Sequence, residues 1–327
     1  MRLSKMVMLF LLIVSQSITA HADSTVRIAV LKYGTVSWVL DVIKRHGFDK
    51  QEGIHLEITP LAGTLATKVA LQAGAADIIV SDWLWVSRQR RSGTDYVFRA
   101  YSTAVGAVMV PKDSPIKSLA DLKGAKIGVA GGPLDKSWLL LTAFAQKHVG
   151  LDLRKETDQV FGAPPLLAQK ARQGELDAVL NFWHYCARLE AAGFRRVKGV
   201  QDAAKGLGIV SEIPMIGYVF SRSWANKNPK LISAFLRATD KANELLKKSD
   251  QEWQRLRPLM RVKDDRTWQV LRDRFRQGIP RKDAPETERD IGILFKILAE
   301  LGGKKLVGVG KELAPGTFWD KPAIRKP

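Results

Sequence analysis

The stretch Asp121-Leu-Lys-Gly-Ala-Lys-Ile-Gly-Val-Ala-Gly-Gly-Pro-Leu-Asp-Lys-Ser137 decides how the chain is organised. Its segment 126–129 predicts a strand, and the glycine pair after that segment predicts a turn that opens a helix. Glycines let a backbone approach a bound molecule closely, and the free N–H groups at a helix start attract an anion. The stretch therefore predicts a ligand-binding turn without a catalytic base, or else an ordinary strand-to-helix turn.

A second turn of the same kind, Leu31–Trp38, follows the first predicted strand. Short apolar strands alternate with amphipathic helices along the chain, which predicts an α/β fold with mostly parallel sheets. The length fits two lobes better than one core. We expect the chain to cross between lobes near 104–107 and to return near 215–218. Two hinge strands of this kind would let the lobes close around a ligand.

The first residues have the pattern of a secretory signal. Charged Arg2 and Lys5 precede a short apolar run, and an A-x-A pattern ends at Ala22, after which cleavage is expected. We therefore expect a protein exported to the periplasm. The predicted segments are a signal peptide at 1–22, the first part of lobe 1 at 23–105, lobe 2 at 106–216, the return to lobe 1 at 217–302 and a C-terminal tail at 303–327.

Composition restricts the partners and cofactors. The 52 Lys and Arg against 33 Asp and Glu give a net charge of +19. An exported protein is not expected to meet nucleic acid, so nucleic-acid binding is not the expected reason for the positive charge. The charge instead indicates a general attraction to anions. The one cysteine, Cys186, cannot form an internal disulfide and is expected to be a buried small side chain. His184 lacks the neighbours and spacing of a metal site, so neither a metal nor a cofactor is predicted.

Four motifs resemble the substrate-binding proteins of ABC importers of the nitrate, sulfonate and taurine type, within the NMT1/THI5-like superfamily. They are Val26-Arg-Ile-Ala-Val with the following Gly34, Leu71-Gln-Ala-Gly-Ala-Ala-Asp-Ile, Asp121-Leu-Lys-Gly-Ala-Lys-Ile-Gly-Val and Gln173-Gly-Glu-Leu-Asp-Ala-Val. The resemblance implies a two-lobed type II periplasmic binding protein that performs no catalysis. Loops 81–85 and 182–185 depart from the family pattern, so its best-known ligands cannot simply be transferred.

Candidate ligand-binding residues follow the carboxyl ends of the predicted strands, where open α/β sheets bind ligands. Aromatic side chains there would stack on a flat ligand or hold a cation, or else pack between the lobes. Asp82 is the strongest acidic candidate because it directly follows a buried strand, whereas Asp135 is most simply a helix N-cap. The full candidate set is Tyr33, Thr35, Trp38, Thr64, Ser81, Asp82, Trp83, Ser102, Gly132, Asp135, Lys136, Ser137, Asn181, Trp183 and Glu212.

The sequence therefore favours a monomeric periplasmic binding protein that delivers a small organic molecule to an ABC permease in the inner membrane. The helix starts and the positive charge favour an anion such as a sulfonate or carboxylate, whereas Asp82, Glu212 and the tryptophans favour a cationic or heteroaromatic ligand. The alternatives are a periplasmic accessory or sensor protein of the same fold and, less favoured, an enzyme resembling the pyrimidine synthase of thiamine synthesis.

Overall fold

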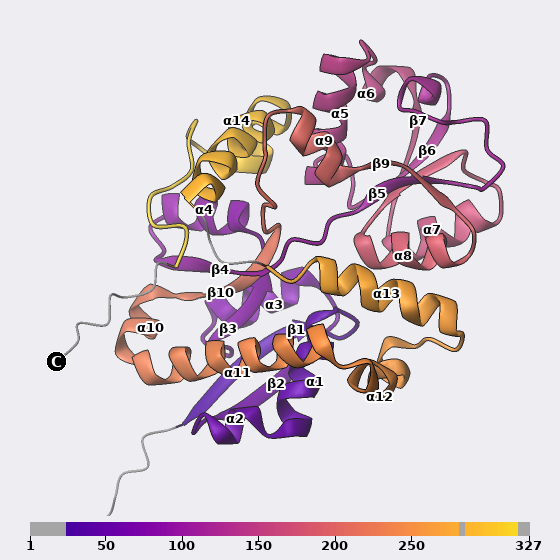
Figure 1. Cartoon of the computed structure of the whole chain (residues 1–327). Helices are drawn as coiled ribbons and strands as arrows, with labels where there is room; N and C mark the ends of the chain where they lie inside the picture. The colour runs from indigo at the N-terminus through magenta and orange to yellow at the C-terminus, as the bar shows by residue number, and fades with distance from the viewer. Residues whose placement is uncertain (1–23, 281–284, 320–327) are drawn as a thin grey trace, which may run out of the picture.

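The computed structural model describes residues 24–280 and 285–319, so the predicted signal peptide at 1–22 lies outside the described residues. Two separate five-stranded sheets organise this part of the chain (Figure 1). We call the part built on the first sheet lobe 1 and the part built on the second sheet lobe 2. The predicted α/β fold with two mostly parallel sheets is confirmed.

Lobe 1 has the strand order β2-β1-β3-β10-β4. β1 is parallel to β2 and β3, whereas β10 is antiparallel to β3 and β4. The central strands are almost continuous apolar runs because both of their faces are covered, and Ile28, Ile78 and Ile79 have no exposed surface. The bounds are β1 (Thr25–Leu31), β2 (His55–Leu61), β3 (Ile78–Ser81), β4 (Tyr96–Ser102) and β10 (Ile216–Ser221).

Lobe 2 repeats this pattern with the strand order β7-β6-β8-β5-β9, in which β5 is the antiparallel strand. The stretch 121–137 supplies β6 and the start of the helix after it, as its sequence predicts. The bounds are β5 (Ala107–Val110), β6 (Lys126–Ala130), β7 (Asp158–Gly162), β8 (Ala178–Asn181) and β9 (Arg195–Gly199).

Helices cover both faces of each sheet. Those of lobe 1 are α1 (Val36–His46), α2 (Phe48–Gln51), α3 (Thr64–Gln72), α4 (Trp83–Arg91), α10 (Arg222–Lys227), α11 (Pro229–Lys248) and α12 (Asp250–Met260). Those of lobe 2 are α5 (Lys136–His148), α6 (Leu153–Glu156), α7 (Pro164–Arg172), α8 (Trp183–Ala191) and α9 (Val200–Gly206), with a short 3-10 turn, η1 (Ala120–Leu122). The sequence does not predict α12.

The chain passes between the lobes through residues 103–106, which join β4 to β5, and through residues 207–215, which join α9 to β10. The first connection needs a glycine, because a Cβ at Gly106 would lie 1.8 Å from the carbonyl oxygen of Asn181. With the connections placed in this way, residues that follow β1 and β3 in lobe 1 come into contact with residues that follow β6 and β8 in lobe 2. The cleft between the lobes is therefore bordered by strand ends from both sheets.

Two C-terminal helices span the lobes. α13 (Asp265–Gln277) packs against α8 of lobe 2, and Figure 1 shows it running along the boundary below α7 and α8. α14 (Pro285–Val307) packs against α5 of lobe 2 and α4 of lobe 1. α13 also contacts α12 of lobe 1, where the Trp268 indole donates to the Trp253 carbonyl, so both helices pack against both lobes.

The described part of the predicted tail returns to lobe 1. Gly303 interrupts α14 with φ 57° and ψ −162°. Further on, the Phe98 N–H donates to the Thr317 carbonyl and the Trp319 N–H donates to the Phe98 carbonyl, at 2.8 and 2.9 Å. Three arginines of α4 also donate to backbone carbonyls between residues 305 and 315: Arg88, Arg90 and Arg91. The tail is thus attached to the edge of the lobe 1 sheet.

Candidate ligand-binding cleft

Two helix starts, one from each lobe, meet in the cleft. Asp82 follows β3 and caps α4, because its carboxylate accepts a hydrogen bond from the Trp85 N–H at 2.9 Å. Lys136 is the first residue of α5, and its ammonium nitrogen lies 3.6 Å from the Asp82 carboxylate. The two side chains are only 21% and 22% exposed. Two predicted site residues therefore form an ion pair between the lobes.

The charges around this pair favour an ionised Asp82. Burial opposes ionisation, but the Lys136 ammonium, the Trp85 N–H and the more distant Lys68 outweigh it, so the pKa of Asp82 lies below its usual value. Lys68 of α3 lies 5.1 Å from the centroid of the Trp85 ring, and burial lowers the pKa of Lys68. The positive charges of Lys136 and Lys68 therefore lie close to the negative charge of Asp82 at this point of the cleft.

Two of the free backbone N–H groups at the start of α5 are already hydrogen-bonded by the N-cap residue of the helix. The Asp135 carboxylate accepts hydrogen bonds from the N–H groups of Ser137 and Trp138 at 2.9 and 3.2 Å, as predicted for an N-cap. Burial raises the pKa of Asp135 above its usual value. The preceding turn has φ 89° at Gly131 and φ 95° at Gly132, which favours glycine at both positions. The N–H groups that the sequence offers to a ligand here are engaged by Asp135.

A cavity of about 620 Å³ lies between the lobes and is lined by residues other than this ion pair. We call it the lateral cavity. Its lobe 1 wall is the loop after β1 together with the end of α12, and its lobe 2 wall is made by α7 and α8. Three predicted site residues line it, namely Tyr33, Thr35 and Trp38. Four of its lining residues are basic and none is acidic; the basic ones are Lys32, Arg172, Arg188 and Arg261.

His184 also lines the lateral cavity. Burial, assisted by the charge of Arg188, lowers the pKa of His184 to about 4, so its ring is neutral at pH 7. The Nδ1 atom of His184 is buried and has no hydrogen-bond partner among the described residues. His184 therefore contributes hydrogen-bonding capacity to the cavity wall at neutral pH, and the positive charge comes from the lysine and the arginines.

The predicted aromatic candidates separate into two groups. Trp38, Trp83 and Trp183 are between 0% and 7% exposed, whereas Tyr33 is 64% exposed. Trp38 packs edge-on against Trp183 across the lobes, with ring centroids 6.1 Å apart, and Phe275 of α13 contacts both rings. The rings of Trp38, Trp183 and Phe275 therefore hold the lobes together, and Tyr33 is the predicted aromatic candidate that stays exposed.

Several predicted polar candidates are engaged within the protein. Asn181 is buried and donates to the Pro164 carbonyl while accepting from the Phe182 N–H. Ser102 is buried and accepts from the Ala104 N–H, and Ser81 is buried at the end of β3. Thr64 is exposed at the start of α3, which has no side-chain cap. The structure thus leaves the start of α3 open, unlike the starts of α4 and α5.

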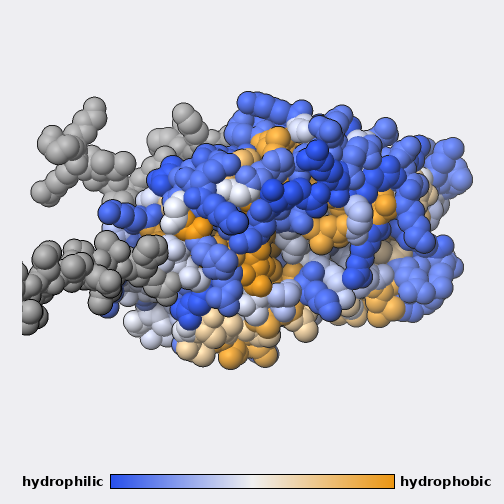
Figure 2. Space-filling view, turned by 90° about the horizontal axis from the view of Figure 1, so that it is seen from below, coloured by the Kyte–Doolittle hydropathy of each residue, from blue (hydrophilic) through white to orange (hydrophobic). Residues whose placement is uncertain are grey.

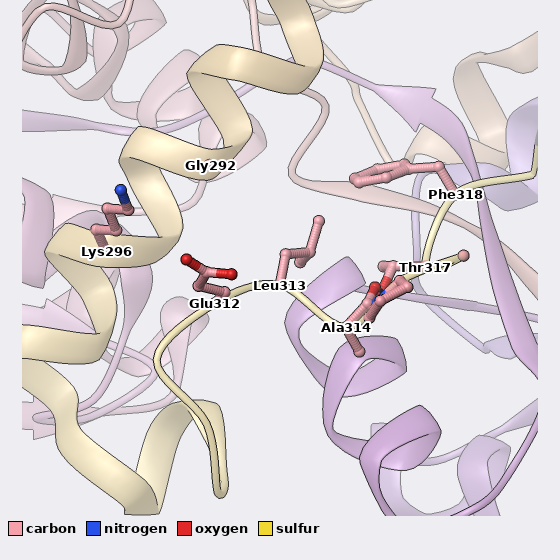
Figure 3. Close-up of a pocket in the computed structure, with 9 residues that line it drawn as sticks. Gly292, Lys296, Glu312, Leu313, Ala314, Thr317 and Phe318 are labelled. Atoms are coloured by element: carbon pink, nitrogen blue, oxygen red, sulfur yellow. The ribbon is translucent and has the colours of Figure 1, made fainter.

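Two other hollows are lined by different residues. Glu212 and Trp183 line one of about 320 Å³ beside connection 103–106. Figure 3 shows a second hollow, of about 440 Å³, between α14 and the tail, with Lys296 and Glu312 on opposite sides.

Residues 24–280 and 285–319 contain no cluster of three or more metal-binding side chains, and none of their helices is long and apolar enough to span a membrane. The face in Figure 2 is mostly hydrophilic, with scattered hydrophobic patches.

None of the four basic residues of the lateral cavity belongs to the predicted candidate set. Lys32 directly follows β1, and the other three are Arg172, Arg188 and Arg261. Arg172 and Arg188 belong to the consecutive helices α7 and α8 of lobe 2, whereas Arg261 ends α12 of lobe 1, much further along the chain. No local motif marks them, and the general excess of basic residues hides them. Only the arrangement of the two lobes brings them together.

The comparisons with known proteins agree with this architecture. The family model described as NMT1/THI5 like matches residues 40–252, which is more than half of the chain. The chain therefore belongs to the NMT1/THI5-like family. Among curated proteins, none matches the sequence at a significant level.

Solved structures show the same fold at low sequence identity. The periplasmic aliphatic sulphonate binding protein SsuA from Escherichia coli superposes with a TM-score of 0.70 at 19% identity, over 93% of this chain and 96% of that chain. The alkanesulfonate-binding protein SsuA from Xanthomonas axonopodis pv. citri, bound to MOPS, gives 0.66 at 18% identity, over 90% and 98%. The desulfurization enzyme DSZB gives 0.57 at 16% identity, over 85% and 92%. At these identities the likeness establishes the fold alone.

Proposed function

We propose that this protein is a periplasmic substrate-binding protein that captures a small organic molecule, preferentially an organic anion such as a sulfonate or carboxylate, and delivers it to an ABC importer in the inner membrane. The observation that carries the proposal is the lateral cavity. It is lined from both lobes, and its charged side chains are all basic. A ligand that contacts both walls would stabilise the closed arrangement of the lobes.

The structural neighbours support the same class of protein. Sulfonate-binding periplasmic proteins from two organisms share the fold over at least nine-tenths of this chain. Export through the predicted signal peptide at 1–22 would place the protein in the compartment from which such importers collect their substrates. We propose a monomer, since the ligand-binding walls come from the two lobes of one chain.

The chemistry of the described thiol favours binding over catalysis. Cys186 is buried, its thiol donates to the backbone carbonyl of Asn181, and burial raises the pKa of Cys186. A thiol in this state is a poor nucleophile, because nucleophilic attack needs the thiolate. We therefore propose that the desulfurization enzyme among the neighbours shares the scaffold and that this chain uses the scaffold for binding.

A thermal-shift screen of the purified protein tests this function. The panel contains sulfonates, carboxylates, nitrate, amines and thiamine-like heterocycles, because any compound that binds only the folded form raises its apparent stability. We expect saturable shifts with organic anions. Shifts with amines or heterocycles alone would overturn the preference for anions, and no shift with any class would argue against a solute-binding role.

A further inference from the structure

The lateral cavity concentrates positive charge that no lining carboxylate neutralises. Lys32 and Arg261 lie in its lobe 1 wall, and Arg172 and Arg188 lie in its lobe 2 wall. Burial lowers the pKa of Arg188; the charge of Arg172 acts in the same direction, whereas Tyr185 and Asp264 oppose the shift. Like charges placed close together repel each other, and an anion between them removes the repulsion. The cavity therefore has the electrostatic character of an anion site.

Arg261 has an unusual backbone for its position. It ends α12 with φ 55° and ψ 48°, and it is the one non-glycine residue with a positive φ in the part of the chain that the structure describes. A helix commonly ends in this conformation, but with glycine or asparagine, since other side chains are strained there. Strained backbone is often found where a side chain has a function. An arginine at this point indicates that its side chain is needed.

The contacts of Arg261 show how it is held. Its guanidinium carbon lies 4.2 Å from the centroid of the exposed Tyr33 ring. A hydrogen bond from Arg261 and the charges of Lys32 and Arg261 lower the pKa of Tyr33. One residue earlier, the Met260 carbonyl accepts a hydrogen bond from Arg188 of lobe 2 at 2.7 Å. The backbone at the end of α12 thus contacts Arg188 of lobe 2, while the Arg261 side chain lies against Tyr33 of lobe 1.

The starts of α4 and α5 are less suitable for an anion. Asp82 brings a carboxylate to the start of α4, where it pairs with Lys136 and accepts from Trp85. Asp135 occupies two N–H groups at the start of α5. An anionic ligand at either start would compete with a carboxylate that is already bound there. The starts of α1, α3, α7 and α8 have no side-chain cap, and the start of α3, next to Gly63, is the competing site that lies outside the lining of the lateral cavity.

The size and lining of the lateral cavity indicate an organic body on the ligand. Cavities of 300–1,000 Å³ in proteins hold molecules of drug size, so about 620 Å³ far exceeds the needs of nitrate or sulfate. Apolar surface from Pro165, Leu259 and Met260 lines the same space, and Leu259 is 43% exposed. An apolar or aromatic group of the ligand would cover this surface together with the ring of Tyr33.

We propose that the lateral cavity is the subsite that holds the acidic group of an organic anion, with Arg261 of lobe 1 and Arg172 and Arg188 of lobe 2 as its binding residues. This subsite rests on the proposed function and deepens it, since it places the acidic group away from the helix starts. The neutral His184 and the hydroxyl group of Tyr33 contribute hydrogen bonds at the cavity wall, and the apolar side chains contact the rest of the ligand.

Calorimetric titration with benzenesulfonate and benzoate tests the subsite, with sulfate and benzylamine as comparators. The test variants are Arg261→Asn, which keeps a residue that tolerates a positive φ, and Arg172→Gln, which changes an exposed side chain. Loss of one charged hydrogen-bond donor lowers affinity by about tenfold or more. We expect this loss in both variants, unchanged affinity in the control Arg154→Gln, and no measurable binding of sulfate or benzylamine. Thermal melts confirm that each variant is folded.

Two further variants represent the competing sites. Gly63→Asp adds a carboxylate at the open start of α3, where a Cβ meets nothing within 4 Å, and Lys136→Gln removes the cation at α5. We expect a smaller loss of affinity in both than in Arg261→Asn. The subsite is overturned if either variant abolishes binding while Arg261→Asn and Arg172→Gln retain it, or if wild-type protein binds neither aromatic anion. If the subsite is overturned but other compounds of the screen still raise the melting temperature of the protein, the proposed solute-binding function stands without this subsite.

Discussion

The carboxylate of Asp82 lies 3.6 Å from the ammonium group of Lys136, and this contact joins the start of α4 in lobe 1 to the start of α5 in lobe 2. Asn at position 82 would keep the helix cap, because Asn and Asp are equally good N-cap residues. Asp82→Asn therefore removes the charge and leaves Lys136 unpaired. We predict that titration calorimetry shows equal or up to about fivefold higher affinity for an organic anion. A tenfold loss would instead show that Asp82 contacts the ligand.

The same aspartate gives a pH-dependent contribution to stability. The folded-state pKa of Asp82 is lowered, so the ionised carboxylate stabilises the fold above its unfolded pKa of about 3.9 and loses this contribution as the pH falls through the folded value. We predict that wild-type protein melts at a higher temperature than Asp82→Asn at pH 7. The difference in melting temperature is expected to shrink as the pH falls below the unfolded pKa of Asp82. A melting-temperature difference between wild type and Asp82→Asn that stays constant with pH would contradict a stabilising role of the Asp82 charge.

Trp83 has no exposed surface, although it follows the candidate residue Asp82. Truncation of a buried tryptophan costs about 3–5 kcal/mol through lost contacts and the cavity left behind. We predict a loss of this size for Trp83→Ala in urea unfolding and a smaller one for Trp83→Phe, because the buried Nε1 has no hydrogen-bond partner among the described residues. Unchanged stability with lost ligand affinity would instead make Trp83 a ligand contact, as its place in the sequence suggests.

Gly106 lies in the first connection between the lobes, with no room for a side chain. Its Cβ would lie 1.8 Å from the Asn181 carbonyl oxygen, a backbone atom that cannot move by itself. We predict that Gly106→Ala destabilises the protein by about 1–3 kcal/mol or more. The matched control is Gly292→Ala in α14, where a Cβ meets nothing within 4 Å and alanine is favoured in a helix by about 0.5–1 kcal/mol. Equal unfolding midpoints for the two variants would refute this explanation.

Sequence patterns predict those parts of the fold that depend on local periodicity. The strand 126–129 and the N-cap Asp135 are found as expected, because short apolar runs and capping residues act over a few positions. The return of the tail to Phe98 is not predicted, since its pairing links segments more than 200 residues apart. The packing of α13 on α8 is also missed, because it joins residues as far apart in the sequence as Glu190 and Arg274, which are separated by 84 positions.

The cleft is harder to predict than the strands. Apolar aromatic residues after a strand suit both a core and a ligand site, so the sequence cannot decide that Trp38 and Trp183 pack together while Tyr33 stays exposed. Asp82 and Lys136 are named separately by the sequence, but their pairing depends on the approach of the lobes. Arg261 carries no local signal at all, because its backbone conformation is typical of glycine or asparagine.

Solution scattering of the purified protein, with and without a saturating ligand from the thermal-shift screen, tests the central claim most directly. The claim is that the ligand lies between two lobes and stabilises their closed arrangement, which requires higher affinity for the closed form. We predict that the radius of gyration falls on ligand addition and that the bound curve fits the arrangement in which Asp82 and Lys136 are in contact. Superimposable curves at saturation would contradict closure of the lobes around the ligand.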